Sequence, residues 1–327
     1  MSARWLVTGA SGFVGGRLCE ALVDAGHETR ALVFRTPLTA SESVTSRLDV
    51  VRGDVRRPED CARACDGVDF VIHCAALLDP VPSEREADEV NHLATATLAD
   101  AAREAGCRAF VYVSSQAAIG WREDAGLVDE AAPCAPSTAY GRSKRAGELA
   151  ALARASEALR VSVLRPPTVY GPGEARNFRA LSDAVATGVF PVIGDGKNRM
   201  SFCHVDNLVE AIRFVASDGG ARGILHVADE PVLTLARVVD ALARASGTRR
   251  LPLRVPLPIA RAGAALLERA FAPFGRRGPL DRARLRTLTS DCALDTGALR
   301  RLGFVPPIAF EDGAREVALR FREGAPR

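Results

Sequence analysis

The sequence is short of aromatic residues and of charge of one sign. Aromatic residues make up 6% of the 327 positions, and 43 basic against 40 acidic side chains leave a formal net charge of +3. A surface that stacks nucleic-acid bases needs more rings, and attraction to nucleic acid or to an anionic membrane needs a larger charge excess. We therefore expect no nucleic-acid partner.

Long uncharged runs are also missing. The most apolar late segment, 257–274, is interrupted by Arg261, Glu268 and Arg269 and falls short of the roughly 20 apolar residues that span a bilayer. Residues 5–7 lead directly into a glycine-containing turn and carry no cleavage pattern of a signal peptide. We expect no integral membrane span and no secretory signal.

The eight cysteines show no metal-binding spacing. No Cys-x-x-Cys occurs, and Cys61 and Cys65 lie four apart without a second pair. Several cysteines fall within apolar runs, where a free thiol behaves as a small hydrophobic side chain. The pattern predicts no metal site and a reduced, cytoplasmic protein.

What the sequence contains is an alternation of short apolar runs with helical patterns. Strands rich in Val, Leu and Phe between helices indicate a parallel sheet that is buried on both faces. The expected strands are 4–8, 28–34, 48–52, 70–73, 109–115 and 161–165. The expected helices are 13–25, 58–65, 84–106, 138–158, 206–217, 234–246, 257–273 and 311–323. The predicted fold class is α/β, a Rossmann doubly wound parallel sheet with a smaller, mainly helical C-terminal part.

Clusters of proline and glycine mark a change in organisation after the sixth expected strand. They gather at 166–173 and 188–196, and helical patterns dominate beyond them. We predict a dinucleotide-binding domain over 1–170, with a returning segment near 200–230, and a substrate-binding cap over 171–327.

A glycine-rich turn lies between the first expected strand and the first expected helix. Residues 8–15 read Thr-Gly-Ala-Ser-Gly-Phe-Val-Gly. In this context the first glycine permits a tight turn, the second lets the backbone approach a pyrophosphate, and the third allows close helix–strand packing. The helix N-terminus adds free N–H groups and partial positive charge. The cofactor-binding residues expected here are Gly9, Ser11, Gly12, Phe13, Val14 and Gly15.

The end of the second expected strand carries an arginine where an NAD site usually carries an acid. Residues 32–36 read Leu-Val-Phe-Arg-Thr. The guanidinium of Arg35 suits the 2′-phosphate of NADP, so we expect NADP(H) to be preferred, with NAD(H) as the other option. An ordinary surface arginine is the alternative, because only two of the basic residues are lysines.

Two further strand ends offer residues that suit a cofactor. After the third strand, Asp54 and the following Val55 could contact the adenine amino group, or Asp54 is a plain turn residue. After the fourth strand, the small side chains of Ala75 and Ala76 let the backbone pass close to the cofactor. His73, just before them, is expected to be a packed residue rather than a catalytic one.

Tyr140 and Lys144 lie four apart at the start of an expected helix, so they share one face, and Ser115 ends the fifth strand. Hydride transfer to or from a carbon–oxygen bond must be matched by a proton. With a pKa of about 10, free tyrosine is a weak base at neutral pH, but a nearby ammonium and an oxidised nicotinamide favour the phenolate. Because a serine hydroxyl can hold the substrate oxygen, we predict that Tyr140, Lys144 and a strand-end serine, Ser114 or Ser115, are catalytic.

Together these motifs resemble the extended short-chain dehydrogenase/reductases, which form the NAD(P)-dependent epimerase/dehydratase superfamily. The resemblance covers 4–173 in the expected order, including RGDV, HCAA, VSS, YGRSK and LRPPTVYGPG, and a weaker match at 202–207 extends it to about residue 228. It implies a Rossmann fold, with Tyr140 as acid/base and Lys144 also bonded to the nicotinamide ribose.

The resemblance also assigns residues that spacing alone does not. It favours Ser115 over Ser114 as the strand-end hydroxyl, and it places Pro167 and Val169 beside the nicotinamide. It gives Asn91 a supporting role at most. It further implies a homodimer that pairs helices through a four-helix bundle.

The C-terminal half departs from the sugar-nucleotide epimerases. Those enzymes commonly carry an arginine followed closely by Gly-Asp, whereas 288–295 reads Leu-Thr-Ser-Asp-Cys-Ala-Leu-Asp. Arg199 is left as a candidate phosphate contact. Dehydratases add acids after the strand-five hydroxyl, but Ser115 is followed by Gln116 and two alanines. The apolar segment 257–274 is more similar to the 3β-hydroxysteroid dehydrogenase-like branch, as a lid, although core and dimer-face roles remain alternatives.

Two functions remain open. The first is an NAD(P)-dependent dehydrogenase or ketone reductase that acts on the secondary alcohol or ketone of a hydrophobic, sterol-, lipid- or polyketide-like small molecule. The second is a nucleotide-sugar 4-epimerase, which returns the hydride to the opposite face. The intact Ser115, Tyr140 and Lys144 argue against a third option, a cofactor-binding regulator without activity.

Overall fold

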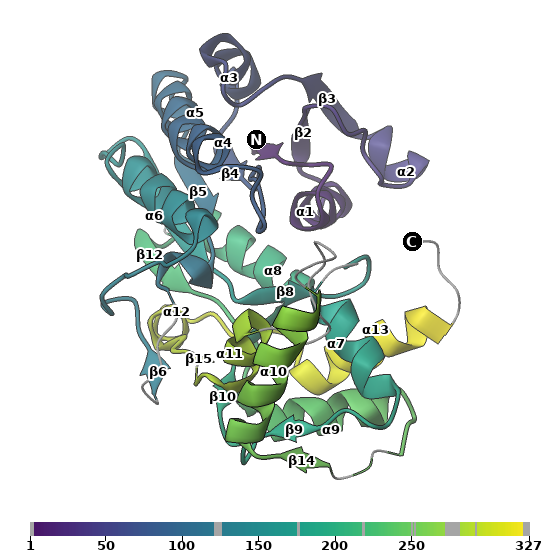
Figure 1. Ribbon diagram of the computed structural model, residues 1–327. Helices are drawn as coiled ribbons and strands as arrows, with labels where there is room; N and C mark the ends of the chain where they lie inside the picture. The colour runs from purple at the N-terminus through teal and green to yellow at the C-terminus, as the bar shows by residue number, and fades with distance from the viewer. Residues whose placement is uncertain are drawn as a thin grey trace.

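A parallel sheet of seven strands forms the centre of the molecule (Figure 1). The computed structural model describes residues 3–120, 126–174, 177–217, 220–249, 251, 253–271, 282–291 and 293–322. The strand order is β12-β7-β5-β4-β1-β2-β3, and every neighbouring pair is parallel. These strands are β1 (Arg4–Thr8), β2 (Glu28–Val33), β3 (Leu48–Arg52), β4 (Phe70–His73), β5 (Ala109–Val113), β7 (Arg160–Arg165) and β12 (Gly223–His226). The order reverses direction between β1 and β4, which is the switch point where doubly wound sheets bind ligands.

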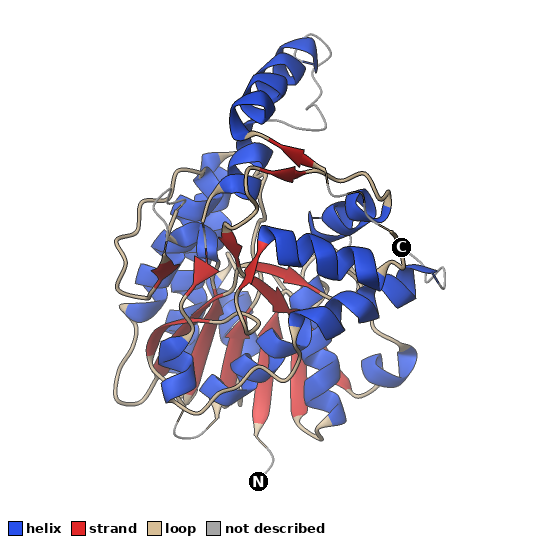
Figure 2. Cartoon of the chain, turned by 90° about the horizontal axis from the view of Figure 1, so that it is seen from below, coloured by secondary structure: helices blue, strands red, loops and turns tan. Residues whose placement is uncertain are grey.

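Helices cover both faces of this sheet, so its strands lie in the middle layer (Figure 2). Helices α1 (Phe13–Asp24) and α8 (Val205–Ala216) pack on one face, and α3 (Pro58–Cys65), α5 (Ala94–Glu104) and α6 (Ala139–Leu152) pack on the other. Successive residues of β1 point to opposite faces, so Val7 joins the first core and Leu6 the second. The predicted doubly wound parallel sheet is confirmed.

The expected helix over 84–106 is interrupted. It consists of α4 (Glu84–Asp88), a π-helical turn η1 (Glu89–Leu93) and α5. The wide turn leaves the carbonyl oxygen of Asn91 to accept from Tyr112 Oη at 3.1 Å and from Thr95 Oγ1 at 2.9 Å. Such turns gather at functional sites, and the apolar periodicity of the sequence does not reveal the extra residue.

A smaller part, with α7, α9, α10, α11 and α13, lies on the side of the molecule away from α3 and α5 (Figure 1). Its core is aromatic and includes Tyr170, Phe178, Phe202 and Phe310. Its helices are α7 (Asn177–Ala186), α9 (Leu235–Ala245), α10 (Leu257–Phe271), α11 (Arg282–Thr289) and α13 (Phe310–Arg322). Its strand pairs are β8 (Thr168–Tyr170) with β11 (Phe202–His204), β9 (Val192–Ile193) with β14 (Arg254–Val255), and β10 (Arg199–Met200) with β13 (Leu233–Thr234). The remaining elements are α2 (Glu42–Thr45), η2 (Gln116–Ala118), α12 (Gly297–Arg301), and β6 (Leu127–Val128), which pairs with β15 (Ala293–Leu294).

The chain crosses between the two parts more than once. After β8 and α7 it returns to the sheet through α8 and β12, and β12 pairs with β7. Asn207 of α8 then ties this region to the last segment, because its Nδ2 donates to the carbonyl oxygen of Ile308 at 2.7 Å and its Oδ1 accepts from Ile308 N at 2.9 Å. The division of the chain at residue 170 stays a prediction.

Helix α10 carries apolar side chains on two faces, one buried and one exposed. Ala260 and Ala264 are buried with Ile193 and Leu285, whereas Ile259 and Leu266 are 63% and 70% exposed. Phe274, which belonged to the expected apolar segment, lies outside the described residues. No helix within the described ranges is long and apolar enough to cross a membrane.

Candidate active site

The glycine-rich turn lies at the carboxyl end of β1 and leads into α1. Gly9 has φ of 67°, and a Cβ there would lie 2.7 Å from the backbone nitrogen of Ala75. A Cβ on Gly15 would lie 2.3 Å from the carbonyl oxygen of Gly9. Gly12 is the N-cap of α1, and no side chain of the described residues caps that helix or places an acid in its first turn. The backbone N–H groups of the first turn of α1, which includes Phe13 and Val14, therefore suit a pyrophosphate.

The end of β2 lies beside this turn. Ser11 Oγ donates to the carbonyl oxygen of Thr36 at 2.6 Å, which brings Arg35 near the turn. Arg35 is exposed, and its guanidinium lies 4.8 Å from the centre of the Phe34 ring. This position fits the predicted contact with a 2′-phosphate.

Asp54 follows β3 and binds a neighbouring arginine. Its Oδ2 accepts from Arg56 Nη2 at 2.6 Å, and its Oδ1 accepts from Arg56 N at 3.0 Å. The hydrogen bond from Arg56 lowers the pKa of Asp54. The carbonyl oxygen of Val55 accepts a hydrogen bond from the Cys61 thiol at 3.2 Å. The predicted contact of Asp54 with adenine therefore competes with an existing ion pair.

The end of β4 is fixed by buried polar side chains. Ala75 N donates to Thr8 Oγ1 at 3.2 Å, and Ala76 follows at a half-buried position. Asn91 then holds the next residue, Leu77: its Oδ1 accepts from Leu77 N at 2.8 Å and its Nδ2 donates to Leu77 O at 3.0 Å. His73 is buried, and burial lowers its pKa to about 3, so it is a neutral packed residue.

Ser115 and Tyr140 come from two segments whose backbones touch. Ser115 Oγ accepts from Ala117 N at 3.1 Å and thereby begins the turn η2. A Cβ on Gly141 would lie 2.4 Å from the carbonyl oxygen of Ala117, so the first turn of α6 packs directly on η2. Tyr140, the second residue of α6, is half-buried at this contact. Glycine at position 141 therefore lets the backbone of α6 approach η2, the turn that Ser115 begins.

Lys144 is buried one turn after Tyr140. Its Nζ donates to the carbonyl oxygen of Val113 at 2.7 Å and lies 4.2 Å from the centre of the Tyr112 ring. Burial lowers the pKa of Lys144 to about 7, and the negative charge of Glu148 acts in the opposite direction. Val113 is two residues before Ser115, so the three predicted catalytic residues gather at the carboxyl end of β5.

Pro167 and Val169 follow the neighbouring strand β7. Pro167 is buried, and Val169 packs against the core beneath α1 and pairs with Cys203 in β11. Gln116 N donates to the carbonyl oxygen of Pro166 at 2.8 Å, which holds this segment beside the turn of Ser115. Both residues lie beyond a strand end, and their position beside a nicotinamide stays a prediction.

The sequence reasoning missed a buried ion pair behind the site. Glu148 of α6 and Arg165 of β7 are 0% exposed and meet through two hydrogen bonds of 2.7 Å. Glu148 lies four residues after Lys144, and Arg165 ends a strand that begins with Arg160 and has apolar or small residues between the two arginines. A charged residue in a strand buried on both faces requires a partner, and that signal was available in the sequence.

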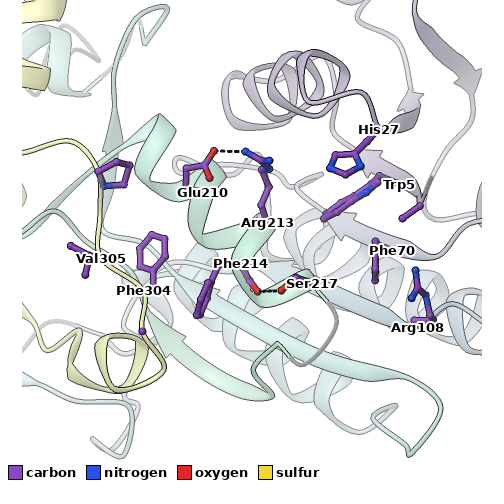
Figure 3. Close-up of a pocket in the computed structure, with 13 residues that line it drawn as sticks. Trp5, His27, Phe70, Arg108, Glu210, Arg213, Phe214, Ser217, Phe304 and Val305 are labelled. Carbon is purple, nitrogen blue, oxygen red and sulfur yellow. Dashed lines mark hydrogen bonds and ion pairs between the residues drawn. The ribbon is translucent and has the colours of Figure 1, made fainter. Parts of the chain in front are cut away.

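A pocket of about 840 Å³ lies at the opposite end of the sheet (Figure 3). Its walls include Trp5 and Phe70 at the amino ends of β1 and β4, and Phe214 of α8 faces Phe304. Arg213 lies between these groups and pairs with Glu210 at 2.7 Å. In doubly wound sheets the chemistry occurs at the carboxyl ends of the strands, so this pocket is not the candidate active site.

The fold and the site define a class. A doubly wound sheet with a glycine turn at β1, together with Tyr and Lys one helical turn apart beside a strand-end Ser, is the architecture of a dinucleotide-dependent oxidoreductase. Residues 5–228 match the model of the NAD dependent epimerase/dehydratase family. The chain belongs to this family.

Known relatives include a ketoreductase and a hydroxysteroid dehydrogenase. The chain is 29% identical to the 4-hydroxy-2-methyl-3-oxo-4-farnesyl-3,4-dihydroquinoline-1-oxide ketoreductase of Stigmatella aurantiaca, over 95% of this chain and 94% of that one. It is 28% identical to the 3 beta-hydroxysteroid dehydrogenase/Delta 5-->4-isomerase of Mycobacterium tuberculosis, over 85% of this chain and 78% of that one. These similarities confirm the resemblance to the 3β-hydroxysteroid dehydrogenase-like branch.

A solved structure extends the comparison to nucleotide sugars. The structure of MoeE5 in complex with UDP-glucose and NAD superposes with a TM-score of 0.74 at 27% identity, covering 99% of this chain and 100% of that one. The relatives and this neighbour show an enzyme of the extended short-chain dehydrogenase/reductase type.

Proposed function

We propose that the protein transfers a hydride between NADP(H) and the secondary alcohol or ketone of a hydrophobic small molecule. The placement of Lys144 carries this proposal: its ammonium donates to the carbonyl oxygen of Val113, two residues before Ser115, and Lys144 lies one helical turn after Tyr140. A bound nicotinamide supplies or accepts the hydride. Tyr140 moves the matching proton, and Ser115 holds the substrate oxygen.

Lys144 supports the acid/base role of Tyr140 through its charge. An ammonium near the phenol favours the phenolate form over the neutral phenol. Lowering a tyrosine pKa by two units takes about 3 kcal/mol of differential interaction. In reduction, the phenol gives its proton to the oxygen of the carbonyl that gains the hydride, and in oxidation the phenolate takes that proton back.

The surroundings of Arg199 favour a substrate without a diphosphate. Arg199 donates from Nη2 to Asp291 Oδ2 at 3.1 Å and from its backbone nitrogen to Asp291 Oδ1 at 2.8 Å. Its charge is thereby matched before any substrate binds. The ketoreductase and hydroxysteroid dehydrogenase relatives point the same way. The MoeE5 complex supports the second candidate, a nucleotide-sugar 4-epimerase.

The preference for NADP(H) rests on Arg35, which replaces the usual acid and lies exposed beside the glycine turn. We also propose a homodimer, because Leu93 of η1 and Leu149 of α6 are 50% and 53% exposed on the helices that would pair. A reducing, cytoplasmic setting is supported by the seven cysteines of the described ranges, all of which are free thiols.

Tyr140→Phe tests the catalytic assignment. We expect turnover of a hydrophobic ketone with NADPH to fall at least about a hundredfold, because the proton donor is lost, while calorimetric NADPH binding stays within about twofold. Tyr170→Phe is the matched control, since it removes a phenol from the core of the smaller part. Unchanged turnover in Tyr140→Phe would refute the assignment.

The same calorimetry separates the two candidate functions. A reductase should bind NADPH more tightly than NADH, give no heat with UDP-glucose, and exchange its cofactor freely. Retained NAD together with UDP-glucose binding would instead establish the epimerase and overturn the argument from Arg35.

A further inference from the structure

Glu148 occupies an unusual position in α6. Its carboxylate is fully buried and accepts four hydrogen bonds: from Ser114 Oγ at 2.6 Å, from Arg165 Nε and Nη2 at 2.7 Å each, and from Arg145 Nη1 at 2.8 Å. The carboxylate therefore has partners on both oxygens. Its helix also carries Lys144, one turn earlier.

These bonds join three elements at the carboxyl edge of the sheet. Ser114 follows β5, Arg165 ends β7, and Glu148 belongs to α6. Ser114 N also donates to the carbonyl oxygen of Leu164 at 2.8 Å, so the chains beyond β5 and β7 stay side by side. Since Ser115 comes directly after Ser114, the carboxylate of Glu148 links the strand end that bears Ser115 to the helix that bears Tyr140.

Stability alone does not call for such a pair. Removing a carboxylate and a guanidinium from water is costly, and well-packed apolar residues of similar size often hold a fold as well or better. Arg165 Nη1 is even left without a hydrogen-bond partner among the described residues. The residues around the Glu148–Arg165 pair should therefore show what role it has.

The neighbours of Lys144 give the pair a role. His73 and Cys74 face Lys144 from the end of β4, and the ring of Tyr112 faces it from β5. Burial lowers the pKa of His73 to about 3 and raises the pKa of the Cys74 thiol to about 12, so both are neutral at pH 7. Burial also raises the pKa of Tyr112. Because His73, Cys74 and Tyr112 are neutral, the negative charge that acts on Lys144 is that of Glu148.

We propose that Glu148 is a positioning residue of the active site. Through Ser114 and Arg165 it fixes the strand end of Ser115 against α6, and its charge keeps Lys144 an ammonium beside Tyr140. The catalytic role of Glu148 rests on the proposed function. The link between the strand end and α6, and the charge of Lys144, are properties that the protein has without substrate.

The lysine content of the chain permits a direct test of the charge. Lys144 and Lys197 are the two lysines of the sequence, so selective ¹³Cε-lysine labelling gives two NMR signals whose shifts follow protonation. We expect Glu148→Gln to lower the midpoint of Lys144 by about one pH unit, because one negative charge is lost and Arg165 is left unmatched. The Lys197 signal should not move.

Glu210→Gln is the matched control, since Glu210 also pairs with an arginine at 2.7 Å but lies at the other end of the sheet. It should leave the Lys144 midpoint unchanged. An unchanged midpoint in folded Glu148→Gln would overturn the electrostatic part of the proposal. Because no turnover is measured, failure of the proposed function would not affect this result.

Ser114→Ala tests the positioning part and does not depend on Glu148→Gln folding. It removes the tie between β5 and Glu148 and keeps every charge. We expect kcat for ketone reduction to fall about tenfold, as expected when a reacting group is misplaced, with the Lys144 midpoint and NADPH affinity unchanged. A wild-type kcat in Ser114→Ala, with Tyr140→Phe inactive, would overturn positioning while leaving the proposed function intact.

Discussion

The ring of His73 is a buried base that stays neutral. Its Nδ1 lies 2.7 Å from Thr8 Oγ1 and its Nε2 lies 3.1 Å from Thr95 Oγ1. Burial, followed by the charge of Lys144, lowers the pKa of His73 to about 3 from an ordinary 6.5. Between these values the unfolded chain binds a proton at this position and the folded chain does not. The free energy of unfolding therefore falls as pH drops from 6.5 toward 3.

Substitution of His73 should remove this part of the pH dependence. At pH 7 we expect His73→Gln to be less stable than the wild type, because the paired hydrogen bonds to the two threonines are disturbed. By pH 4 the deficit should shrink by about 3 kcal/mol. Urea unfolding of both proteins from pH 4 to 7 measures the difference, and two parallel stability curves would contradict the expectation.

Single residues also show where sequence reasoning succeeds and stops. Tyr140 and Lys144 were predicted to share a face because helical spacing is local, and their positions on α6 agree with it. The partner of Glu148 lies in a strand 17 residues further along the chain, and its choice depends on how β7 and α6 pack. Pairings of that kind are set by the tertiary fold, so the sequence reasoning did not find Arg165.

Close packing between α6 and η1 depends on Gly147. A Cβ at this position would lie 2.2 Å from the carbonyl oxygen of Asn91 and 2.5 Å from Tyr112 Oη. Gly147→Ala should therefore destabilise the protein by about 1–3 kcal/mol, although alanine favours a helix by about 1 kcal/mol over glycine. Thermal or denaturant unfolding measures the change.

Gly263 of α10 provides the opposite case on another helix. A Cβ there meets no described atom within 4 Å. Gly263→Ala should leave stability unchanged or raise it by up to about 1 kcal/mol. If both variants changed stability in the same direction and by the same amount, the contact between α6 and η1 would not be the cause.

At the level of elements, the six expected strands agree with the structure to within two residues, because their hydrophobic pattern is continuous. The expected helix over 138–158 ends at Leu152, and the seventh strand, β12, was not among the expected strands. The structure ends the second and fifth strands at Val33 and Val113, somewhat before the expected ends. The two-residue strands of the smaller part, such as β9 and β14, were not predicted. A strand this short forms because its partner is nearby, and its own sequence has no periodicity to read.

In the whole molecule, Asn207 connects the sheet to the last helix. Its Nδ2 donates to Asp229 Oδ1 and to the carbonyl oxygen of Ile308, each at 2.7 Å. Asn207→Ala should loosen α13 before the rest of the fold, since Ile308 lies two residues before that helix and loses both bonds. We expect a loss of about 1–3 kcal/mol and faster hydrogen exchange over 310–322, measured by mass spectrometry.

Asn198 supplies a control of the same chemistry at another place. Its Nδ2 donates to the carbonyl oxygen of Leu288 at 3.0 Å, so Asn198→Ala should speed exchange around α11 and not in α13. Equal exchange in α13 for the two variants would show that Asn207 is not its specific tether.

For the whole molecule, the sequence predicts the arrangement of strands and helices better than the side-chain contacts that connect distant segments. The alternation of strands and helices indicated the doubly wound sheet, and the weaker motif at 202–207 indicated a return to it. The tether between Asn207 and Ile308 was not predicted, because an asparagine at the start of a helix is common and its partner lies 101 positions away.

The pairing of β12 with β7 also bears on how the chain acquires its fold during synthesis. A ribosome releases the N-terminal segments first, so the strands β1 to β7 emerge well before residues 223–226. Throughout that interval β7 is the edge of an unfinished sheet and exposes a row of unpaired N–H and C=O groups. Newly made chains are therefore most exposed to wrong partners just before β12 arrives, and a truncation after residue 170 would make that state permanent.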